Sequence, residues 1–287
     1  MDKIDCLDHG FVRLVDRMGD DASIVEAARC SYQNGTTISR ADKELINYLY
    51  RHKHTTPFEM VEFKFHCKMP IFVARQWIRH RTANVNEYSA RYSILEKEFY
   101  IPRPEQLMPQ SKANKQGSAG VMSDEHKANV VETLQNVSDN CYMAYQMLLG
   151  EGGDDMGGDY PGLSRELARM IVPTNIYTQW YWKIDLHNLL HFLSLRMDSH
   201  AQYEIRVFAD AIYELIKPHV PAAIEAFDEY HPYRFAQTLS GKEINLLSLL
   251  LSNHEYRLTV ETPEAFSKGE WNEFREKIKK IAPERVA

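Results

Sequence analysis

The chain has 287 residues, enough to bury a core as one large domain or two small ones, and its 44% hydrophobic and 26% charged residues are ordinary for a globular protein. The net charge of −6 disfavours a large nucleic-acid footprint, and no apolar run is long enough to span a bilayer. We expect a cytoplasmic protein, because the N-terminus lacks the apolar stretch of a signal peptide and four widely spaced cysteines without a CxxC pair argue against a disulfide framework or a structural zinc site.

The first half of the chain is predicted to mix strands and helices. Two short strands are expected around the turn at Asp8-His9-Gly10, followed by helices over about 22–32 and 39–52. Residues 59–69 then alternate between apolar and polar side chains, as a strand does when one sheet face is buried and the other is wet. Such a strand favours antiparallel or mixed pairing over a buried parallel core.

A helix over 70–80, with Pro70 at its first position, is expected to lead into a polar loop. Residues 108–123 read as a surface insertion. The amphipathic helix predicted over 123–149 carries an apolar stripe of Val130, Leu134, Val137, Cys141 and Leu148. The glycine-rich loop 150–162 is not a phosphate loop, because no strand precedes it and no lysine follows at the required spacing.

The second half continues this mixture. A short helix capped by Ser164 and a strand over 176–184 are followed by a helix that Asp185 caps and by another that begins at Ser199. After Pro232, helical patterns near 243–251 and 263–281 are most simply a packing appendage. The whole pattern predicts an α+β fold, a mixed or antiparallel sheet flanked by helices.

The segment RHRTANVNEYSARY, residues 79–92, crowds four basic side chains into one polar stretch: Arg79, His80, Arg81 and Arg91. Guanidinium groups this close repel one another unless an anion lies among them, and each holds a phosphate through two parallel hydrogen bonds. The segment therefore predicts a site for a small phosphate or pyrophosphate ligand, to which Arg169 and Arg196 would contribute. Ser89 is interpreted as a hydrogen-bond donor, because a nucleophile would need a neighbouring base.

Two histidine pairs allow several interpretations. His52 and His54 lie two residues apart without carboxylate partners at helical spacing, and His187 and His191 lie four apart on one predicted helix without the Glu of HExxH. The residues alone favour core or hydrogen-bonded histidines over metal ligands.

Segment 79–92 resembles the signature of the flavin-dependent thymidylate synthases, Arg-His-Arg, seven residues, then Ser. The family's GHxTPFEH is similar to HKHTTPFEM here, FVARQWxRHR to FVARQWIRHR, ARxxLPxNxYT to ARMIVPTNIYT, and FLxLRxDxHAQxEI to FLSLRMDSHAQYEI. These motifs occur in the same order and cover about Asp2 to Tyr230. The resemblance implies a synthase domain over 1–231, with an extension of unknown role over 232–287.

The resemblance also implies an activity. Members of this family make thymidylate from dUMP, with methylenetetrahydrofolate as carbon donor, NADPH as reductant and FAD as carrier, and they release tetrahydrofolate. They are homotetramers whose active sites are shared between subunits. No nucleic-acid or membrane partner and no metal is implied. The family does not need a reactive cysteine beside the pyrimidine, and none of the four cysteines lies in the signature segment.

Carried over motif by motif, the resemblance implies a dUMP site lined by Gln76, Arg79, Glu87, Ser89, Ala90, Arg91, Arg169 and Arg196. Arg91 and Arg169 are the phosphate candidates, and Arg196 would act catalytically by favouring the ionised uracil ring. The implied FAD contacts are Thr56, Arg79, His80, Arg81, Glu87, Asp185, His187 and His191. His54 is expected beside the flavin as a second catalytic candidate.

Three positions depart from the family pattern: Asn84 stands for a Ser, Ala90 for a Gly and Met60 for a His. Two other functions are weighed against the synthase. A non-catalytic RNA- or nucleotide-binding protein would show a basic stripe outside the motif. A flavoprotein that methylates uracil in RNA would need a large positive face, which the composition does not supply.

Overall fold

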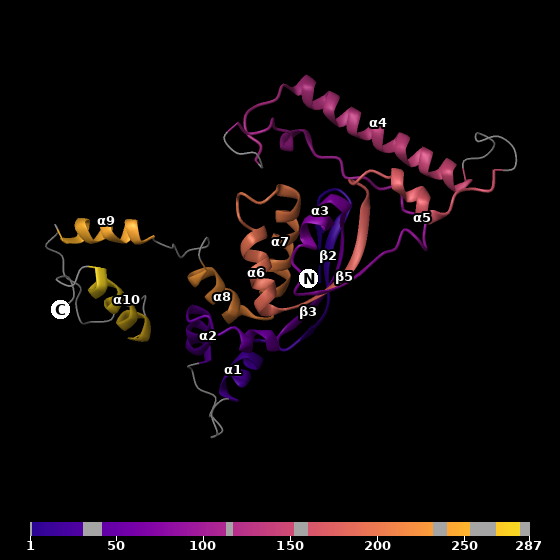
Figure 1. Cartoon of the computed structure of the whole chain (residues 1–287). Helices are drawn as coiled ribbons and strands as arrows, with labels where there is room; N and C mark the ends of the chain where they lie inside the picture. Colours follow the sequence, from indigo (N-terminus) through magenta and orange to yellow (C-terminus); the bar gives the residue numbers. More distant parts are fainter. Residues whose placement is uncertain are drawn as a thin grey trace.

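The structure is a computed structural model, and it describes residues 2–30, 42–112, 117–151, 160–231, 240–252 and 268–281. At its centre lies a five-stranded antiparallel sheet with the order β1-β2-β3-β5-β4 (Figure 1). The strands are β1 (Lys3–Cys6), β2 (Gly10–Met18), β3 (Glu62–Pro70), β4 (Asn84–Glu87) and β5 (Tyr177–Asp185). The predicted α+β class is confirmed.

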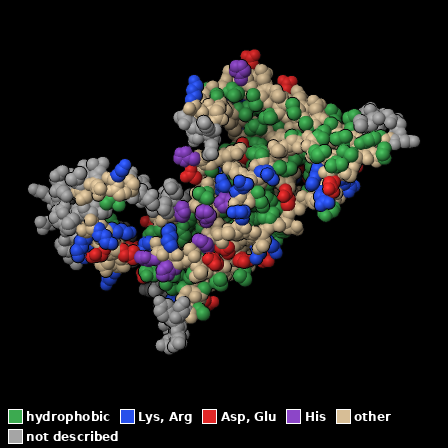
Figure 2. Space-filling model, in the orientation of Figure 1, with side chains coloured by type: hydrophobic (Ala, Val, Ile, Leu, Met, Phe, Trp, Pro, Cys, Tyr) green, Lys and Arg blue, Asp and Glu red, His purple; other side chains and the backbone are tan. Residues whose placement is uncertain are grey.

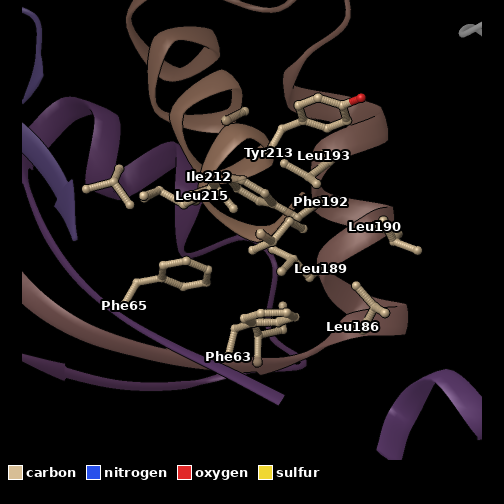
Figure 3. Close-up of a cluster of buried hydrophobic side chains, with 14 of the residues drawn as sticks. Phe63, Phe65, Leu186, Leu189, Leu190, Phe192, Leu193, Ile212, Tyr213 and Leu215 are labelled. Carbon is tan, nitrogen blue, oxygen red and sulfur yellow. The ribbon is translucent and has the colours of Figure 1, made fainter. Parts of the chain in front are cut away.

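The predicted alternation along β3 is also confirmed. Phe63, Phe65, Cys67 and Met69 are fully buried, while the polar residues between them stay partly exposed on the other face. On the buried face, Phe63 and Phe65 point toward α6 (Leu186–Arg196) and α7 (Tyr203–Ile216), as Figure 3 shows. The apolar area removed from water on this face stabilises the packing of α6 and α7 on the sheet.

The remaining helices surround this layer. Three of them pack against one another: α1 (Asp21–Arg29), α2 (Asp42–Arg51) and α8 (Pro221–Tyr230). The helix α3 (Ile71–Trp77) follows β3 directly. A second, smaller core lies under the long helix α4 (Asp124–Leu149) and the short α5 (Arg165–Ala168), where Tyr145 is fully buried.

Several local predictions were wrong for identifiable reasons. Residues 84–87, predicted as part of a loop, form β4, because they pair with β5 from Lys183 to Trp180. The helix α8 was not predicted at all, although Pro221 at its start and four buried apolar residues mark it. Pro70 is the residue before the helix α3, not its first residue, and it also ends β3.

Two helix predictions need correction as well. The helix expected from Ser199 begins at Tyr203, so its capping box does not form, although Ile205, Phe208 and Ile212 are buried as predicted. The apolar stripe predicted on α4 faces outward in part. Val137 is 52% exposed, whereas Ser138, Tyr142 and Tyr145 of the same helix are buried against the second core.

Other predicted ends and loops lie outside the described residues, among them the stretch 31–41 and most of the loop 150–162. The tail contains α9 (Gly241–Ser252) and α10 (Lys268–Ile281), close to the predicted helical segments. In α10 the side chain of Trp271 is buried and stacks on Phe274 at 5.6 Å. Within the described ranges, no helix is both long and apolar enough to cross a membrane.

Candidate active site

The end of α6 places a guanidinium group against an imidazole. Arg196 Nε donates a hydrogen bond of 3.0 Å to Nε2 of His80, which follows α3 and packs edge-on against Phe192 at 5.0 Å. Burial and the positive charge of Arg196 lower the pKa of His80 to about 4, with His191 adding a further lowering effect. His80 is therefore neutral at physiological pH and acts as the acceptor that orients Arg196.

Arg196 lines an open cavity of about 690 Å³ together with residues from α3, from the end of α6 and from the turn after it: Gln76, Ser194, Leu195, Asp198, His200, Ala201 and Gln202. The Oε1 atom of Gln76 is buried and has no hydrogen-bond partner among the described residues. A buried acceptor without a partner is costly, so it indicates a place where a ligand donates. His200, held by Asp198 at 2.9 Å, belongs to this cavity and was not predicted as a site residue, although it lies in the quoted FLSLRMDSHAQYEI motif.

A second cavity, of about 170 Å³, opens between the end of α2 and α6. Its lining includes His54, Thr55, Phe58, His187 and His191, with Leu49, Tyr50, Lys53, Leu190 and His231. The lining combines aromatic, apolar and imidazole side chains, a mixture that suits a flat heteroaromatic ring, so these residues fit a flavin. Figure 2 shows histidine side chains gathered with Lys and Arg side chains on this face of the molecule.

Two of the predicted flavin contacts have other surroundings. Thr56, the first residue of a short 3-10 helix, is exposed, and Thr55 lines the cavity in its place. Asp185 caps α6, where its carboxylate accepts hydrogen bonds from the backbone N–H of Asn188 at 2.9 Å and from its side-chain amide at 2.7 Å. Its role in the described structure is therefore the predicted helix cap.

The end of the signature segment forms a separate cationic group. Both Nε and Nη2 of Arg91 donate to one carboxylate oxygen of Glu166 at the start of α5, and Arg169 Nε donates to the Glu166 carbonyl at 3.2 Å. Ser89 Oγ accepts from the Arg91 backbone N–H at 3.3 Å, and Ala90 lies between them. Arg91 and Glu166 are both exposed, at 49% and 57%, so the ion pair is a weak one that an anionic ligand displaces at small cost.

The remaining predicted site residues are Arg79 and Arg81, which precede β4, and Glu87, which lies on β4. Arg79 and Arg81 are exposed, and neither has an ion-pair partner in the described part of the chain. Glu87, on β4, accepts a hydrogen bond of 2.8 Å from Thr178 Oγ1 on β5. The two arginines are therefore open to a ligand, whereas Glu87 already has a hydrogen-bond partner within the sheet.

The structure brings together only part of the predicted nucleotide site. Gln76 and Arg196 share one cavity, whereas Ser89, Arg91 and Arg169 gather around Glu166. No hydrogen bond or ion pair joins these two groups among the described residues. One chain thus supplies two separate halves of the predicted dUMP lining.

The cysteines stay away from both cavities. Cys6 and Cys67 are buried in the core, and burial raises the pKa of the Cys6 thiol to about 12 and that of Cys67 well above its usual range. Cys30 and Cys141 do not line either cavity. A thiolate nucleophile beside the Arg196 cavity is therefore not part of this site.

Helices around one antiparallel sheet define an α+β protein, and arginine and histidine side chains line its open cavities. The family model described as "Thymidylate synthase complementing protein" matches residues 13–222. The flavin-dependent thymidylate synthase of Ruegeria pomeroyi is 53% identical over 95% of this chain and 86% of its own, and that of Rickettsia bellii is 50% identical over 96% and 93%.

A solved structure is similar as well. The UMP/dUMP methylase PolB from Streptomyces cacaoi, bound with 5-Br UMP, is 31% identical with a TM-score of 0.68, covering 79% of this chain and 97% of its own. The family match spans most of the chain and the relatives match at about half of all positions. The chain therefore belongs to the flavin-dependent thymidylate synthase family, as the sequence motifs predicted.

Proposed function

We propose that this protein converts dUMP to dTMP by reductive methylation, with methylenetetrahydrofolate as carbon donor, NADPH as reductant and tetrahydrofolate as product. The observation that carries the proposal is the environment of the Arg196 side chain. There a part-buried guanidinium, oriented by a neutral His80, shares a cavity with the buried and unpartnered Oε1 of Gln76. A pyrimidine ring offers what both groups lack, an N–H to donate and carbonyl oxygens to accept.

Arg196 acts on the ring by its charge. A fixed cation beside uracil stabilises negative charge on the ring and makes C5 more nucleophilic, and it does so without reorganisation because His80 already holds its Nε. Burial lowers the pKa of Arg196 from its ordinary value, yet the group stays protonated, since arginine starts far above neutrality.

FAD is the flavin we propose for the cavity lined by His54, His187 and His191, with the exposed Arg79 and Arg81 balancing its pyrophosphate. When bound, the flavin supplies the hydride chemistry that the side chains lack. Thr56 and Glu87 remain proposed contacts, beside Thr55, which lines the cavity. His54 is the proposed catalytic neighbour of the ring.

We also propose a cytoplasmic homotetramer with shared active sites. In this arrangement Ser89, Ala90, Arg91 and Arg169 of one subunit complete the site that Gln76 and Arg196 begin in another, which accounts for two unconnected groups in one chain. Mixing Arg196→Ala protein with Arg91→Ala protein, after subunit exchange and at a dUMP concentration far below the raised KM of Arg91→Ala, should restore part of the native rate. Activity that stays at the level of each variant alone contradicts shared sites.

The decisive experiment measures tritium release from C5-labelled dUMP with methylenetetrahydrofolate and NADPH present. Purified protein should be yellow, and NADPH should bleach it faster when dUMP is added. UMP should be tested beside dUMP, because the similar PolB is a UMP/dUMP methylase. A colourless protein that retards RNA in a gel and releases no tritium would instead establish the binding-protein alternative.

A further inference from the structure

The turn that carries His54 into the flavin cavity has an unusual backbone. At the end of α2, His54 N–H donates to the Leu49 carbonyl at 2.9 Å and Lys53 N–H to the Tyr50 carbonyl at 3.1 Å. These are the two hydrogen bonds of a Schellman cap, whose left-handed position is usually glycine. Here that position is Lys53, with φ of 62°, in a conformation that costs a non-glycine residue free energy and persists only when its surroundings hold it.

The residues before this turn are held by the C-terminal helix α10, which lies beside α2 (Figure 1). Arg51 donates to both carboxylate oxygens of Glu273, from Nε at 2.8 Å and from Nη2 at 2.9 Å, and to Glu270 at 3.3 Å. Its side chain is only 15% exposed, and its guanidinium lies 5.4 Å from the ring of Tyr230. A bidentate, partly buried ion pair of this kind fixes the position of the Arg51 side chain better than an exposed ion pair would.

The carboxylate of Glu273 also contacts the next residue of the turn, His52. His52 Nε2 lies 3.0 Å from Glu273 Oε1, and the His52 ring packs on Tyr48 at 4.3 Å. Although burial acts against it, hydrogen bonds from Arg51 and His52 keep the pKa of Glu273 below its usual value, so the carboxylate is charged at neutral pH. Glu273 thus holds Arg51 and His52, the two residues that precede the left-handed Lys53.

The residues after Lys53 enter the cavity. His54 and Thr55 line it opposite His187 and His191, and Lys53 itself contributes to the rim. The backbone therefore connects His52, which α10 holds, through the strained Lys53 directly to His54, which lines the cavity. The family motif quoted above has glycine at this position, where no such support is needed.

We propose that α10, through Glu273, is a positioning element for the flavin cavity: it holds the left-handed turn at Lys53 so that His54 faces the ligand. This role for the C-terminal extension rests on the proposed flavin site.

The test uses the full-length protein with its flavin removed, titrated with FAD and followed by flavin fluorescence. Glu273→Ala should bind FAD about tenfold more weakly, the factor that one residue's backbone strain corresponds to. Glu276→Ala is the matched control, because Glu276 lies on the same helix, is 68% exposed and pairs only with Lys279 in the described contacts. Its affinity should equal that of the native protein.

Replacing the strained residue separates positioning from a general loss of structure. Lys53→Gly in the Glu273→Ala background should restore FAD affinity to within about threefold of native, because glycine adopts the left-handed conformation without support. Hydrogen exchange of residues 48–55, measured without FAD, should speed up in Glu273→Ala and not in Glu276→Ala. The milder Glu273→Gln should shift both readouts in the same direction.

Unchanged affinity and unchanged exchange in Glu273→Ala would overturn the proposal, and so would weak binding that Lys53→Gly fails to rescue. A native protein that does not bind FAD at all would instead overturn the proposed function. The exchange measurement would then still report whether α10 holds the turn, so the two failures are distinguishable.

Discussion

Two cationic regions of this protein differ in how their charge is held. Arg196 is part-buried, ends a core helix and is oriented by a neutral imidazole at 3.0 Å. Arg91 is 49% exposed, lies in the turn after β4 and is paired with Glu166. Arg196 has no carboxylate partner among the described residues, whereas Arg91 has a weak internal partner that, in the proposed function, a phosphate replaces. The proposed roles follow this difference in burial: the part-buried Arg196 would act on the ring, and the exposed Arg91 would capture the substrate.

The largest effect is expected at the buried cation. Arg196→Ala should lower tritium release from C5-labelled dUMP by about 100- to 1000-fold, because it removes a preorganised charge from the ring. FAD absorbance should persist in the purified variant. Arg17→Ala, an exposed arginine on β2 far along the sheet, is the control and should keep the native rate. Undiminished release from Arg196→Ala would refute the role given to this residue.

A smaller effect, on binding, is expected at the exposed cation. Arg91→Ala should raise the KM for dUMP about 10- to 100-fold, since it deletes a charge-assisted phosphate contact, and should leave FAD affinity unchanged. Glu166→Gln should leave that KM unchanged or lower it, because the competing carboxylate is gone. The comparison between the two regions fails if Arg91→Ala lowers kcat and spares KM.

The lowered pKa of His80 leads us to expect that the stability of the fold depends on pH. Its folded pKa of about 4 lies below the ordinary value of 6.5, so the unfolded state binds more protons between these values and stability falls as pH falls through this window. The slope from this group is at most about 1.4 kcal/mol per pH unit. Urea unfolding at pH 7 and pH 5 should show a smaller loss in His80→Gln than in the native protein, and equal losses would contradict a neutral His80.

The smallest effect is expected at Ser89. As a hydrogen-bond donor without a base, it should contribute only a few-fold, so Ser89→Ala should keep kcat within about tenfold of native. Ser93→Ala, four residues along the same turn, provides a baseline for local disturbance. A fall of several thousandfold in Ser89→Ala alone would mean that the hydroxyl is the attacking group.

Much of the fold was predictable because its signals are local. The alternation along residues 59–69, the cap at Asp185 and the apolar face of α7 each depend on neighbours within a turn or a strand, and the structure has all three. The strand β4 was not predictable from its own residues, since it pairs with β5, about 95 positions further along the chain. The exposed stripe of α4 was misassigned because helical spacing gives a face but not what covers it.

The sequence by itself determined the family, through motifs of arginine, histidine and serine whose order and spacing chance does not produce. It also predicted anionic ligands, because clustered guanidinium groups need anions. Only the tertiary structure decided which of these cations is buried and which is exposed, where Glu166 balances Arg91, and that a carboxylate of α10 holds the turn before His54. The physical reason is that charge and hydrogen-bonding capacity belong to the residue type, whereas burial and partners come from segments that the fold brings together over distances the sequence does not encode locally.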